Sequence, residues 1–327
     1  MKKTNIAIVA GGYSSEMVVS LKSADGIYSF IDPRKYRPYI VLVTKTGWKV
    51  ALPDGTETDI DKNDFSFSVK GEKTAFDFAC ITIHGTPGEN GLLQGYFDMI
   101  GLPYSCCGVL PAALTFNKYV CNNYLKGFGI KTADSLRLRA GEAVGNDEII
   151  RRLGLPLFVK PSDGGSSFGT TKVKTPEDIQ PAIAQAFAEG EEVIVEAFMP
   201  GTEVTCGCYK LRNKEVVLPI TEIVSKHEFF DYSAKYAGQV EEITPARISP
   251  ALTGEIQRQT SGIYDLLGAK GIIRVDYIIS PEGEIRMLEV NTTPGMTATS
   301  FIPQQVRAAG LSIEEVMSDI IENELRK

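Results

Sequence analysis

The amino-acid sequence predicts an α/β protein whose C-terminal half is of the α+β type. Over the first hundred residues, apolar strand patterns alternate with helical ones, which is typical of a parallel sheet flanked by helices. From residue 201 onward, long strands of antiparallel character follow one another. The length of 327 residues exceeds what one hydrophobic core usually supports, so two or three domains are expected. We place three domains, at residues 1–106, 107–196 and 197–327.

The first domain contains short apolar runs bounded by turn residues. The expected elements are strands at residues 5–10, 39–43, 78–83 and 103–105 and helices at residues 15–30 and 92–100. Parallel sheets bind ligands at the carboxyl ends of their strands. Gly11-Gly12 and His84-Gly85 would both lie there.

Beyond residue 107 the pattern changes to longer strands and amphipathic helices. The expected elements are helices at residues 111–126, 175–188, 251–267 and 313–325 and strands at residues 157–160, 192–196, 203–211, 215–223, 272–279 and 285–290. Thr175 is the expected N-cap of its helix, with Pro176 at the first helical position. Residues 225–242 lack periodicity and are polar, which predicts a mobile functional loop.

Composition restricts the class of protein. The hydrophobic share of 43% and the charged share of 23% are those of an ordinary soluble protein, and a net charge of −7 argues against a nucleic-acid partner. The six cysteines form no CxxC pair and only two histidines accompany them, so we expect reduced thiols rather than a zinc site. The first apolar run is too short for a signal peptide, and no run approaches a membrane span. We therefore expect a cytoplasmic protein that does not bind a membrane.

The most informative segment is an acidic hairpin near the C-terminus. Its two apolar strands are joined by the turn-prone sequence Ser-Pro-Glu-Gly at residues 280–283. With a loop at residues 281–284, Asp276 lies opposite Glu289, and Asn291 points to the same face about 6–7 Å further along. Three hard oxygen ligands on one face suit one or two Mg²⁺ ions.

A surface hairpin with solvated acids is the alternative interpretation. It is disfavoured because apolar residues of core type flank the acids on both strands. These are Val275, Tyr277, Leu288 and Val290. The sequence therefore favours the metal site.

A second candidate site is the loop at residues 160–169, which follows a predicted buried strand. Its three glycines and three serines allow close backbone approach to a polyphosphate, and Lys160 can meet a phosphate as a point charge. The loop is neither a Walker A motif nor GxGxxG, and the missing GxGxxG excludes the nicotinamide dehydrogenase that the N-terminal pattern would suggest. With the acidic hairpin downstream, the loop predicts an ATP site.

Taken together, eight segments resemble the ATP-grasp enzymes, and more narrowly the D-alanine–D-alanine ligase family, over essentially the whole chain. They are residues 11–16 with 19–21; 84–91; Lys118; 160–169; Glu196 with 200–203; 231–236; Arg274 with Asp276; and 289–297 with Ser300. The order is that of the family, which makes the joint match specific. Met17 and Asn90 depart from the pattern of many members. The resemblance implies an ATP-grasp fold with an N-terminal Rossmann-like parallel-sheet domain and ATP bound between the central and C-terminal domains.

The resemblance also implies an ATP site and a metal site. Glu196 would bind the adenine amino group and Glu203 the ribose hydroxyls. Apolar contacts to the base, lysines for the phosphates and a serine closing over the γ-phosphate would complete the ATP site: Phe198, Met199, Lys118, Lys160, Lys235 and Ser167. Asp276, Glu289 and Asn291 would hold two Mg²⁺ (or Mn²⁺) ions.

The reaction that the resemblance implies joins two D-alanine molecules through a D-alanyl phosphate, releases ADP and phosphate, and serves peptidoglycan synthesis in the bacterial cytoplasm, in a homodimer. Arg274 and the N–H of Gly295 would bind the oxyanion. The residues that would contact or orient the substrates are Glu16, Ser166 and Tyr236 with His84 for the first D-alanine, and Ser300 for the second.

Simpler roles remain open for several of these residues, and so do other functions. Glu16 could be a helix N-terminal acid, His84 a strand-end histidine, Tyr236 a packing aromatic and Lys118 a solvated lysine. A D-alanine–D-lactate ligase, another ATP-grasp carboxylate–amine ligase and a non-catalytic nucleotide-binding protein are the alternative functions.

Overall fold

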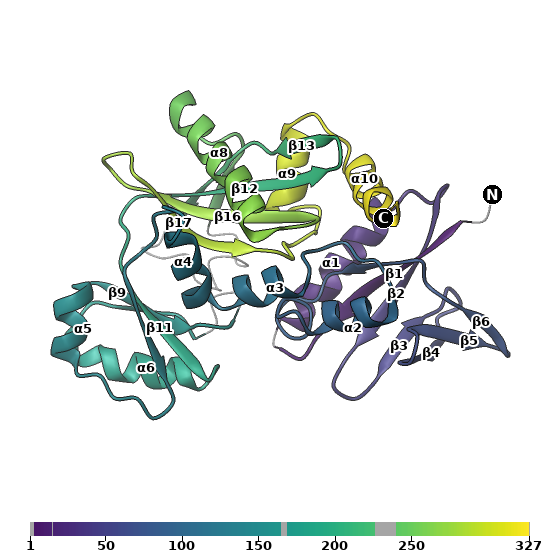
Figure 1. The fold of residues 1–327 in the computed structure, drawn as a ribbon, viewed down its shortest axis with the longest axis horizontal. Helices are drawn as coiled ribbons and strands as arrows, with labels where there is room; N and C mark the ends of the chain where they lie inside the picture. The colour runs from purple at the N-terminus through teal and green to yellow at the C-terminus, as the bar shows by residue number, and fades with distance from the viewer. Residues whose placement is uncertain (1–2, 15, 165–168, 226–239, 327) are drawn as a thin grey trace.

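The protein is described by a computed structural model that covers residues 3–14, 16–164, 169–225 and 240–326 (Figure 1). The elements in chain order are β1 (Thr4–Gly11), α1 (Met17–Phe30), β2 (Tyr36–Val43), β3 (Trp48–Ala51), β4 (Glu57–Asp61), β5 (Ser66–Val69), β6 (Glu72–Thr74), β7 (Phe78–Ile81), α2 (Leu92–Ile100), α3 (Val109–Phe116), α4 (Lys118–Lys126), β8 (Ser135–Arg139), α5 (Asn146–Leu153), β9 (Leu157–Pro161), β10 (Thr171–Val173), η1 (Pro176–Asp178), α6 (Ile179–Phe187), β11 (Glu192–Ala197), β12 (Thr202–Leu211), β13 (Lys214–Val217), β14 (Thr221–Ser225), β15 (Val240–Ile243), α8 (Pro250–Leu267), β16 (Ile272–Ile279), β17 (Ile285–Asn291), α9 (Phe301–Ala308) and α10 (Ile313–Leu325). Within these ranges, none of the helices combines the length and apolar character that crossing a bilayer requires.

The N-terminal sheet has seven strands in the order β6-β5-β4-β3-β2-β1-β7. Strand β1 pairs in parallel with both β2 and β7, so the predicted parallel core is confirmed. The expected strand at residues 103–105 is wrong, because only an isolated bridge joins Tyr104 to Ala79. The antiparallel strands β3 to β6 were not anticipated, since their short, largely exposed segments carry little apolar signal.

The other two sheets are antiparallel. The four-stranded sheet has the order β10-β9-β11-β8, and α5 and α6 pack on it through Ile149, Ile179 and Ile183. The second sheet has the order β15-β14-β12-β16-β17, with β13 added to β12. Helix α8 covers one of its faces, where Ile263 packs among residues such as Val275. This sheet carries the hairpin β16–β17.

Three predicted elements are interrupted. The helix expected at residues 111–126 breaks at Asn117, whose extended backbone ends α3 and whose side chain accepts the N–H of Val120 at 2.9 Å to cap α4. The strand expected at residues 215–223 divides into β13 and β14 around Pro219, which cannot donate a ladder hydrogen bond. The helix expected from Thr175 begins as the 3₁₀ turn η1, and Thr175 donates to the Asp178 side chain instead of capping the backbone.

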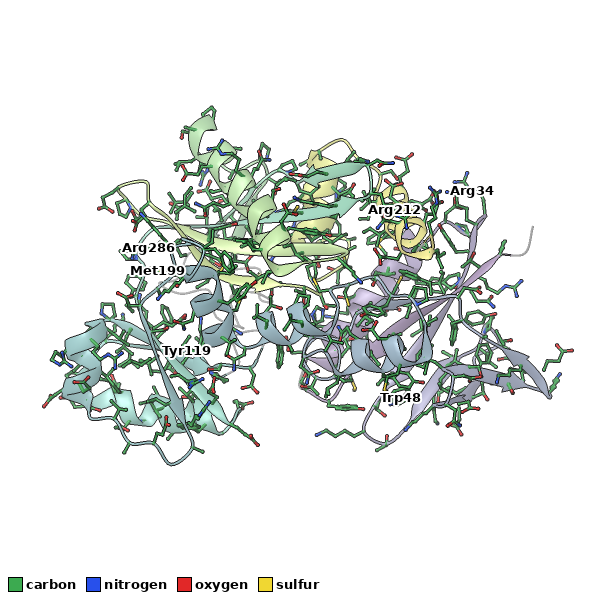
Figure 2. The ribbon with its side chains drawn as sticks, in the orientation of Figure 1. Arg34, Trp48, Tyr119, Met199, Arg212 and Arg286 are labelled. Atoms are coloured by element: carbon green, nitrogen blue, oxygen red, sulfur yellow. The ribbon has the colours of Figure 1, made fainter. Side chains whose placement is uncertain are left out.

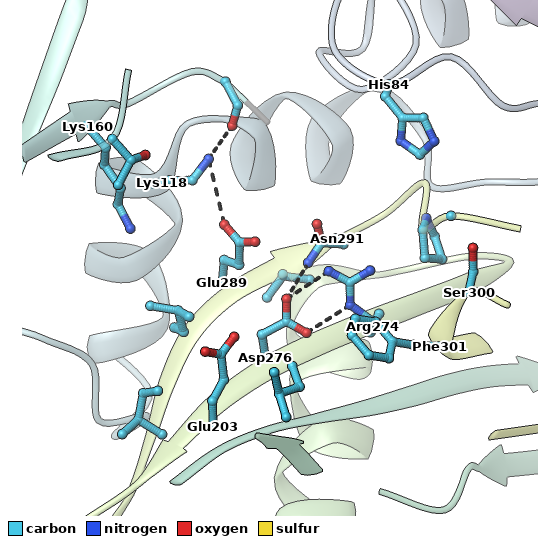
Figure 3. A pocket seen from close by; sticks show the side chains of 18 of the residues that line it. His84, Lys118, Lys160, Glu203, Arg274, Asp276, Glu289, Asn291, Ser300 and Phe301 are labelled. Carbon is cyan, nitrogen blue, oxygen red and sulfur yellow. Dashed lines mark hydrogen bonds and ion pairs between the residues drawn. The ribbon is translucent and has the colours of Figure 1, made fainter. Parts of the chain in front are cut away.

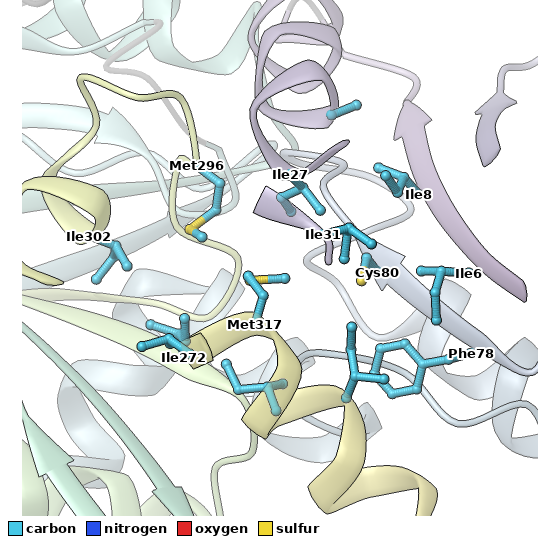
Figure 4. Close-up of a cluster of buried hydrophobic side chains, with 14 of the residues drawn as sticks. Ile6, Ile8, Ile27, Ile31, Phe78, Cys80, Ile272, Met296, Ile302 and Met317 are labelled. Carbon is cyan, nitrogen blue, oxygen red and sulfur yellow. The ribbon is translucent and has the colours of Figure 1, made fainter. Parts of the chain in front are cut away.

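An apolar cluster joins the N-terminal sheet to the C-terminal helices. Ile6 and Ile27 belong to it, together with Ile302 of α9 and Met317 of α10 (Figure 4). An exposed ion pair, Arg34 Nη2 to Glu314 Oε1 at 3.1 Å, also joins the N-terminal region to α10; Arg34 is labelled in Figure 2. Such surface pairs contribute less than about 1 kcal/mol, so apolar burial dominates this contact. The domain boundaries after residues 106 and 196 stay predictions.

Candidate active site

A cleft of about 950 Å³ brings together residues of both antiparallel sheets with residues of α1 and of the segment that follows β7. Every predicted site residue that the structure describes lines it: Glu16, His84, Lys118, Lys160, Glu196, Phe198, Met199, Glu203, Arg274, Asp276, Glu289, Asn291, Gly295 and Ser300 (Figure 3). The remaining predicted residues, Ser166, Ser167, Lys235 and Tyr236, lie outside the described residues, as does most of the predicted mobile loop.

The hairpin β16–β17 pairs Asp276 with Glu289, as predicted, although for a different reason. Ile279 pairs with Ile285, so the connecting loop spans residues 280–284 rather than 281–284. That loop alone would shift the register by one residue. A bulge at Leu288, between the pairs Tyr277–Met287 and Asp276–Glu289, restores it. The bulge therefore decides that the two acids face each other.

The Asp276 carboxylate receives four hydrogen bonds. Arg274 donates twice, from Nε to Oδ1 and from Nη2 to Oδ2, each at 2.8 Å. Asn291 Nδ2 donates to Oδ2 at 3.0 Å, and Thr205 Oγ1 donates to Oδ1 at 2.6 Å. Arg274 in turn lies over the ring of Phe301, 5.4 Å from its centroid. A buried carboxylate held by several donors has little freedom to rotate.

Lys118 lies between Glu289 and the predicted phosphate loop at residues 160–169. Lys118 Nζ lies 3.7 Å from Glu289 Oε2 and also donates to the Gly164 carbonyl (Figure 3). The backbone N–H of Lys118 donates to the Ser162 carbonyl at 2.8 Å. The break before α4 therefore places this lysine between the acidic hairpin and the start of the loop.

Lys160 and Glu196 form a buried ion pair on neighbouring strands. Lys160 Nζ lies 2.5 Å from Glu196 Oε2, and Asn122 Nδ2 of α4 donates to Glu196 Oε1 at 3.1 Å. Burial by itself would lower the pKa of Lys160, but the nearby carboxylates, Glu196 first, raise it overall. The lysine stays charged and can meet a phosphate.

Next to this pair, the segment between β11 and β12, which connects the two antiparallel sheets, supplies apolar surface. The rings of Phe198 and Phe158 lie 6.1 Å apart, and Met199 follows directly in the cleft wall. Glu203 lies at the start of β12, on the same wall. An apolar slot with carboxylates at its edge can hold a purine and a ribose.

The opposite end of the cleft is formed by α1, the end of β7 and the loop at residues 293–300. Glu16, directly before α1, is only 5% exposed. Gly26 of α1 packs so closely on this loop that a Cβ there would lie 2.1 Å from the Met296 carbonyl oxygen. Ser300 Oγ accepts the N–H of Thr297 at 3.0 Å and lies 3.1 Å from where a Cβ on Gly295 would be. The loop and the helix thus share one compact wall.

His84 is buried between α1 and Arg274. Its Nε2 lies 3.4 Å from Ser23 Oγ. Burial, and then the positive charge of Arg274, lower the pKa of His84 to about 4. The imidazole is therefore neutral near neutral pH and can accept or donate one hydrogen bond in the cleft.

Glu89 also lines the cleft, and it belongs to the segment 84–91, for which the resemblance implies a role only at His84. Its Oε2 accepts the N–H of Gly85 at 2.7 Å. Burial, and then the negative charge of Glu16, raise the pKa of Glu89. Its position five residues after His84 is visible in the sequence, but its placement beside Glu16 is not.

Whether the hairpin suits a divalent cation depends on its donor set. The described residues contain no group of three or more His, Cys, Asp or Glu side chains placed to hold a metal. The hairpin offers two carboxylates and one carboxamide, and Mg²⁺ typically takes one or two carboxylates and completes its shell with phosphate oxygens and water. The residues present therefore fit a metal bound together with a nucleotide.

Comparison with known proteins covers nearly the whole chain. Residues 5–107 match the model of the D-ala D-ala ligase N-terminus, and residues 124–322 match that of its C-terminus. The D-alanine–D-alanine ligase of Parabacteroides distasonis is 69% identical over 324 residues, which cover 99% of this chain and 98% of that protein.

Solved structures also resemble this chain over nearly its whole length. A D-Ala:D-Ser ligase from Enterococcus faecalis superposes with a TM-score of 0.86 at 30% identity, covering 99% and 100% of the two chains. A Bacillus anthracis D-alanine–D-alanine ligase complexed with ATP gives a TM-score of 0.78 at 28% identity, covering 99% and 98%. The predicted ATP-grasp fold is confirmed, and the chain belongs to the D-alanine–D-alanine ligase family.

Proposed function

We propose that this enzyme ligates two D-alanine molecules to D-alanyl-D-alanine at the expense of ATP, through a D-alanyl phosphate, for peptidoglycan synthesis. One observation supports this proposal most: a single cleft contains all the described residues of the predicted nucleotide, metal and substrate sites. The chain also belongs to the family that performs this reaction. We place the reaction in the bacterial cytoplasm.

In the first step, the carboxylate of one D-alanine attacks the γ-phosphorus of ATP, and ADP leaves. Lys118 and Lys160 neutralise phosphate charge from two sides, and Glu203 and the Phe198 wall orient the nucleoside. Asp276, Glu289 and Asn291 would hold one or two Mg²⁺ or Mn²⁺ ions, which when bound neutralise the charge on the transferring phosphoryl group. Positioning and charge neutralisation are the main sources of rate in phosphoryl transfer.

In the second step, the amine of the second D-alanine attacks the acyl carbon to form a tetrahedral intermediate; the nitrogen loses a proton, and the intermediate collapses to the amide as the C–O bond to phosphate breaks and phosphate leaves. Arg274 and the N–H of Gly295 stabilise the oxyanion, and Ser300 binds the carboxylate of the incoming D-alanine. Glu16 and His84 bind the first D-alanine, with Ser166 and Tyr236 orienting Glu16. Ser167 and Lys235 complete the phosphate contacts.

Product analysis tests this proposal. Purified protein, ATP, Mg²⁺ and D-alanine should give ADP, phosphate and D-alanyl-D-alanine in equal amounts, with L-alanine as the negative control. AMP and pyrophosphate as products would contradict a D-alanyl phosphate, because they indicate adenylation. Competition with D-lactate and D-serine at the second position distinguishes the depsipeptide and D-Ala:D-Ser alternatives.

We also propose that the enzyme works as a homodimer. Helices α2 and α3 contact each other (Figure 1). They expose four large apolar side chains: Leu92, Met99, Val109 and Leu110. Met99 is 81% exposed and Leu110 is 74% exposed. A second copy of this chain would bury them.

A further inference from the structure

One donor to Asp276 comes from the neighbouring strand β12 and lies outside the cleft lining. Thr205 pairs directly with Asp276 across β12 and β16, so the two side chains share one face of the sheet. Its hydroxyl donates to Asp276 Oδ1 at 2.6 Å, and the residue is fully buried. Its neighbours Val204 and Cys206 pack on the other face under α8. The Thr205 hydroxyl is therefore buried and donates its hydrogen bond to the Asp276 carboxylate.

The other donors to Asp276 differ from Thr205 in one respect. Arg274 and Asn291 are cleft residues with roles of their own, towards the oxyanion and the metal. A carboxylate offers about four lone-pair positions, and all of them have donors in this arrangement. A cation at Asp276 must replace a donor from the cleft side, whereas Thr205 approaches from the neighbouring strand β12, outside the cleft lining, and can stay.

Helix α9 fixes the strand that carries Thr205. Gln305 is fully buried and donates from Nε2 to the Thr205 carbonyl at 3.0 Å, while its Oε1 accepts the N–H of Gly207 at 3.0 Å. A Cβ at Gly207 would lie 2.8 Å from that Oε1, so the glycine makes room for the amide. Because α9 starts directly after Ser300, the helix that follows the second-substrate loop is bonded to β12, the strand that pairs with the strand of Asp276.

We propose that Thr205 is a positioning residue that orients Asp276 for the divalent cation, with Gln305 holding Thr205 in place. This inference rests on the proposed metal-dependent reaction. Partners of metal ligands typically set metal affinity or activity by about 10- to 100-fold.

The test compares Thr205→Val, which keeps the shape and loses the hydroxyl, with Thr205→Ser, which keeps the hydroxyl. Thr260→Val is the matched control, because Thr260 is equally buried and bonds to Tyr277 on the α8 side. Two quantities are measured: the Mg²⁺ concentration for half-maximal ADP release, and Mn²⁺ binding to the protein–ADP complex from the free Mn²⁺ EPR signal, with ADP alone as the blank.

We expect Thr205→Val to raise the Mg²⁺ concentration for half-maximal ADP release and to weaken Mn²⁺ binding, each by about 10- to 100-fold. Thr205→Ser and Thr260→Val should stay within about threefold of wild type in both quantities. Unchanged Mn²⁺ binding in Thr205→Val would overturn the proposal, as would equal losses in the serine or Thr260 variants, which would indicate packing alone. If Thr205→Val does not fold, Thr205→Ala carries the same comparison. A wild type that binds Mn²⁺ but makes no D-alanyl-D-alanine would contradict the proposed reaction and leave the Mn²⁺ comparison decisive for Thr205.

Discussion

Glu289 is the residue whose charge matters most at the proposed metal site. It lies opposite Asp276 and 3.7 Å from the Lys118 ammonium, so it borders both the hairpin and the phosphate loop. We expect Glu289→Gln to lower turnover by at least about 10²-fold while leaving the melting temperature nearly unchanged, because a preorganised charge at the transferring phosphoryl group is lost. ADP release at saturating Mg²⁺ measures the effect.

The matched control for this prediction is Glu284→Gln. Glu284 lies in the loop of the same hairpin, where it pairs with Lys131 and Arg286 away from the cleft. The Glu284→Gln variant should therefore retain the turnover of wild type. Near-normal turnover in Glu289→Gln would show that the hairpin does not hold the metal.

His84 gives a prediction on pH. Because burial, with Arg274 adding to it, lowers its pKa from 6.5 to about 4, the folded protein binds fewer protons than the unfolded chain between these values. The contribution of His84 to the free energy of unfolding is therefore full above about pH 6.5 and falls as the pH drops towards 4, by up to about 3 kcal/mol. Urea unfolding of wild type and His84→Asn across this range should show the loss only in wild type; parallel curves would contradict it.

At the scale of elements, the contact of α1 with the loop at residues 293–300 depends on Gly26. An alanine Cβ there would lie 2.1 Å from a backbone carbonyl oxygen, so α1 or the loop must move. We expect Gly26→Ala to destabilise the fold by about 1–3 kcal/mol, despite the better helix propensity of alanine, and to raise the KM for D-alanine. Thermal unfolding and initial rates measure both effects.

Gly262 provides the comparison for Gly26, because it also lies inside a helix, α8, with open space around its Cβ position. Gly262→Ala should stabilise the protein by about 0.5–1 kcal/mol through helix propensity alone. Similar changes in stability for the two substitutions would contradict the prediction, because they would show that the contact between α1 and the loop at residues 293–300 accommodates a Cβ at Gly26.

For the whole molecule, the exposed apolar side chains of α2 and α3 predict the dimer surface. Glutamate at Met99 and Leu110 would place two charges in a buried contact, so the double variant should be monomeric by light scattering where wild type is dimeric. Phe128→Glu is the control, since Phe128 is 54% exposed and lies beyond α4. An unchanged mass in the double variant would exclude this surface as the interface.

The sequence by itself determined the strands that carry a strong apolar pattern and the residues gathered in the cleft. The parallel strands β1, β2 and β7 and the hairpin β16–β17 follow from runs of buried residues, because burial and strand period are local properties. The family motifs located the described site residues, whose chemical roles stay predictions.

Only the tertiary structure decided the contacts that no local pattern encodes. The bulge at Leu288 sets the register of Asp276 and Glu289, and the break at Asn117 places Lys118. The placement of Glu89 beside Glu16 and the bond from Thr205 to Asp276 arise where separate segments meet. Side chains far apart in the chain acquire their partners and pKa values only when folding removes water between them, and that desolvation depends on packing rather than on sequence period.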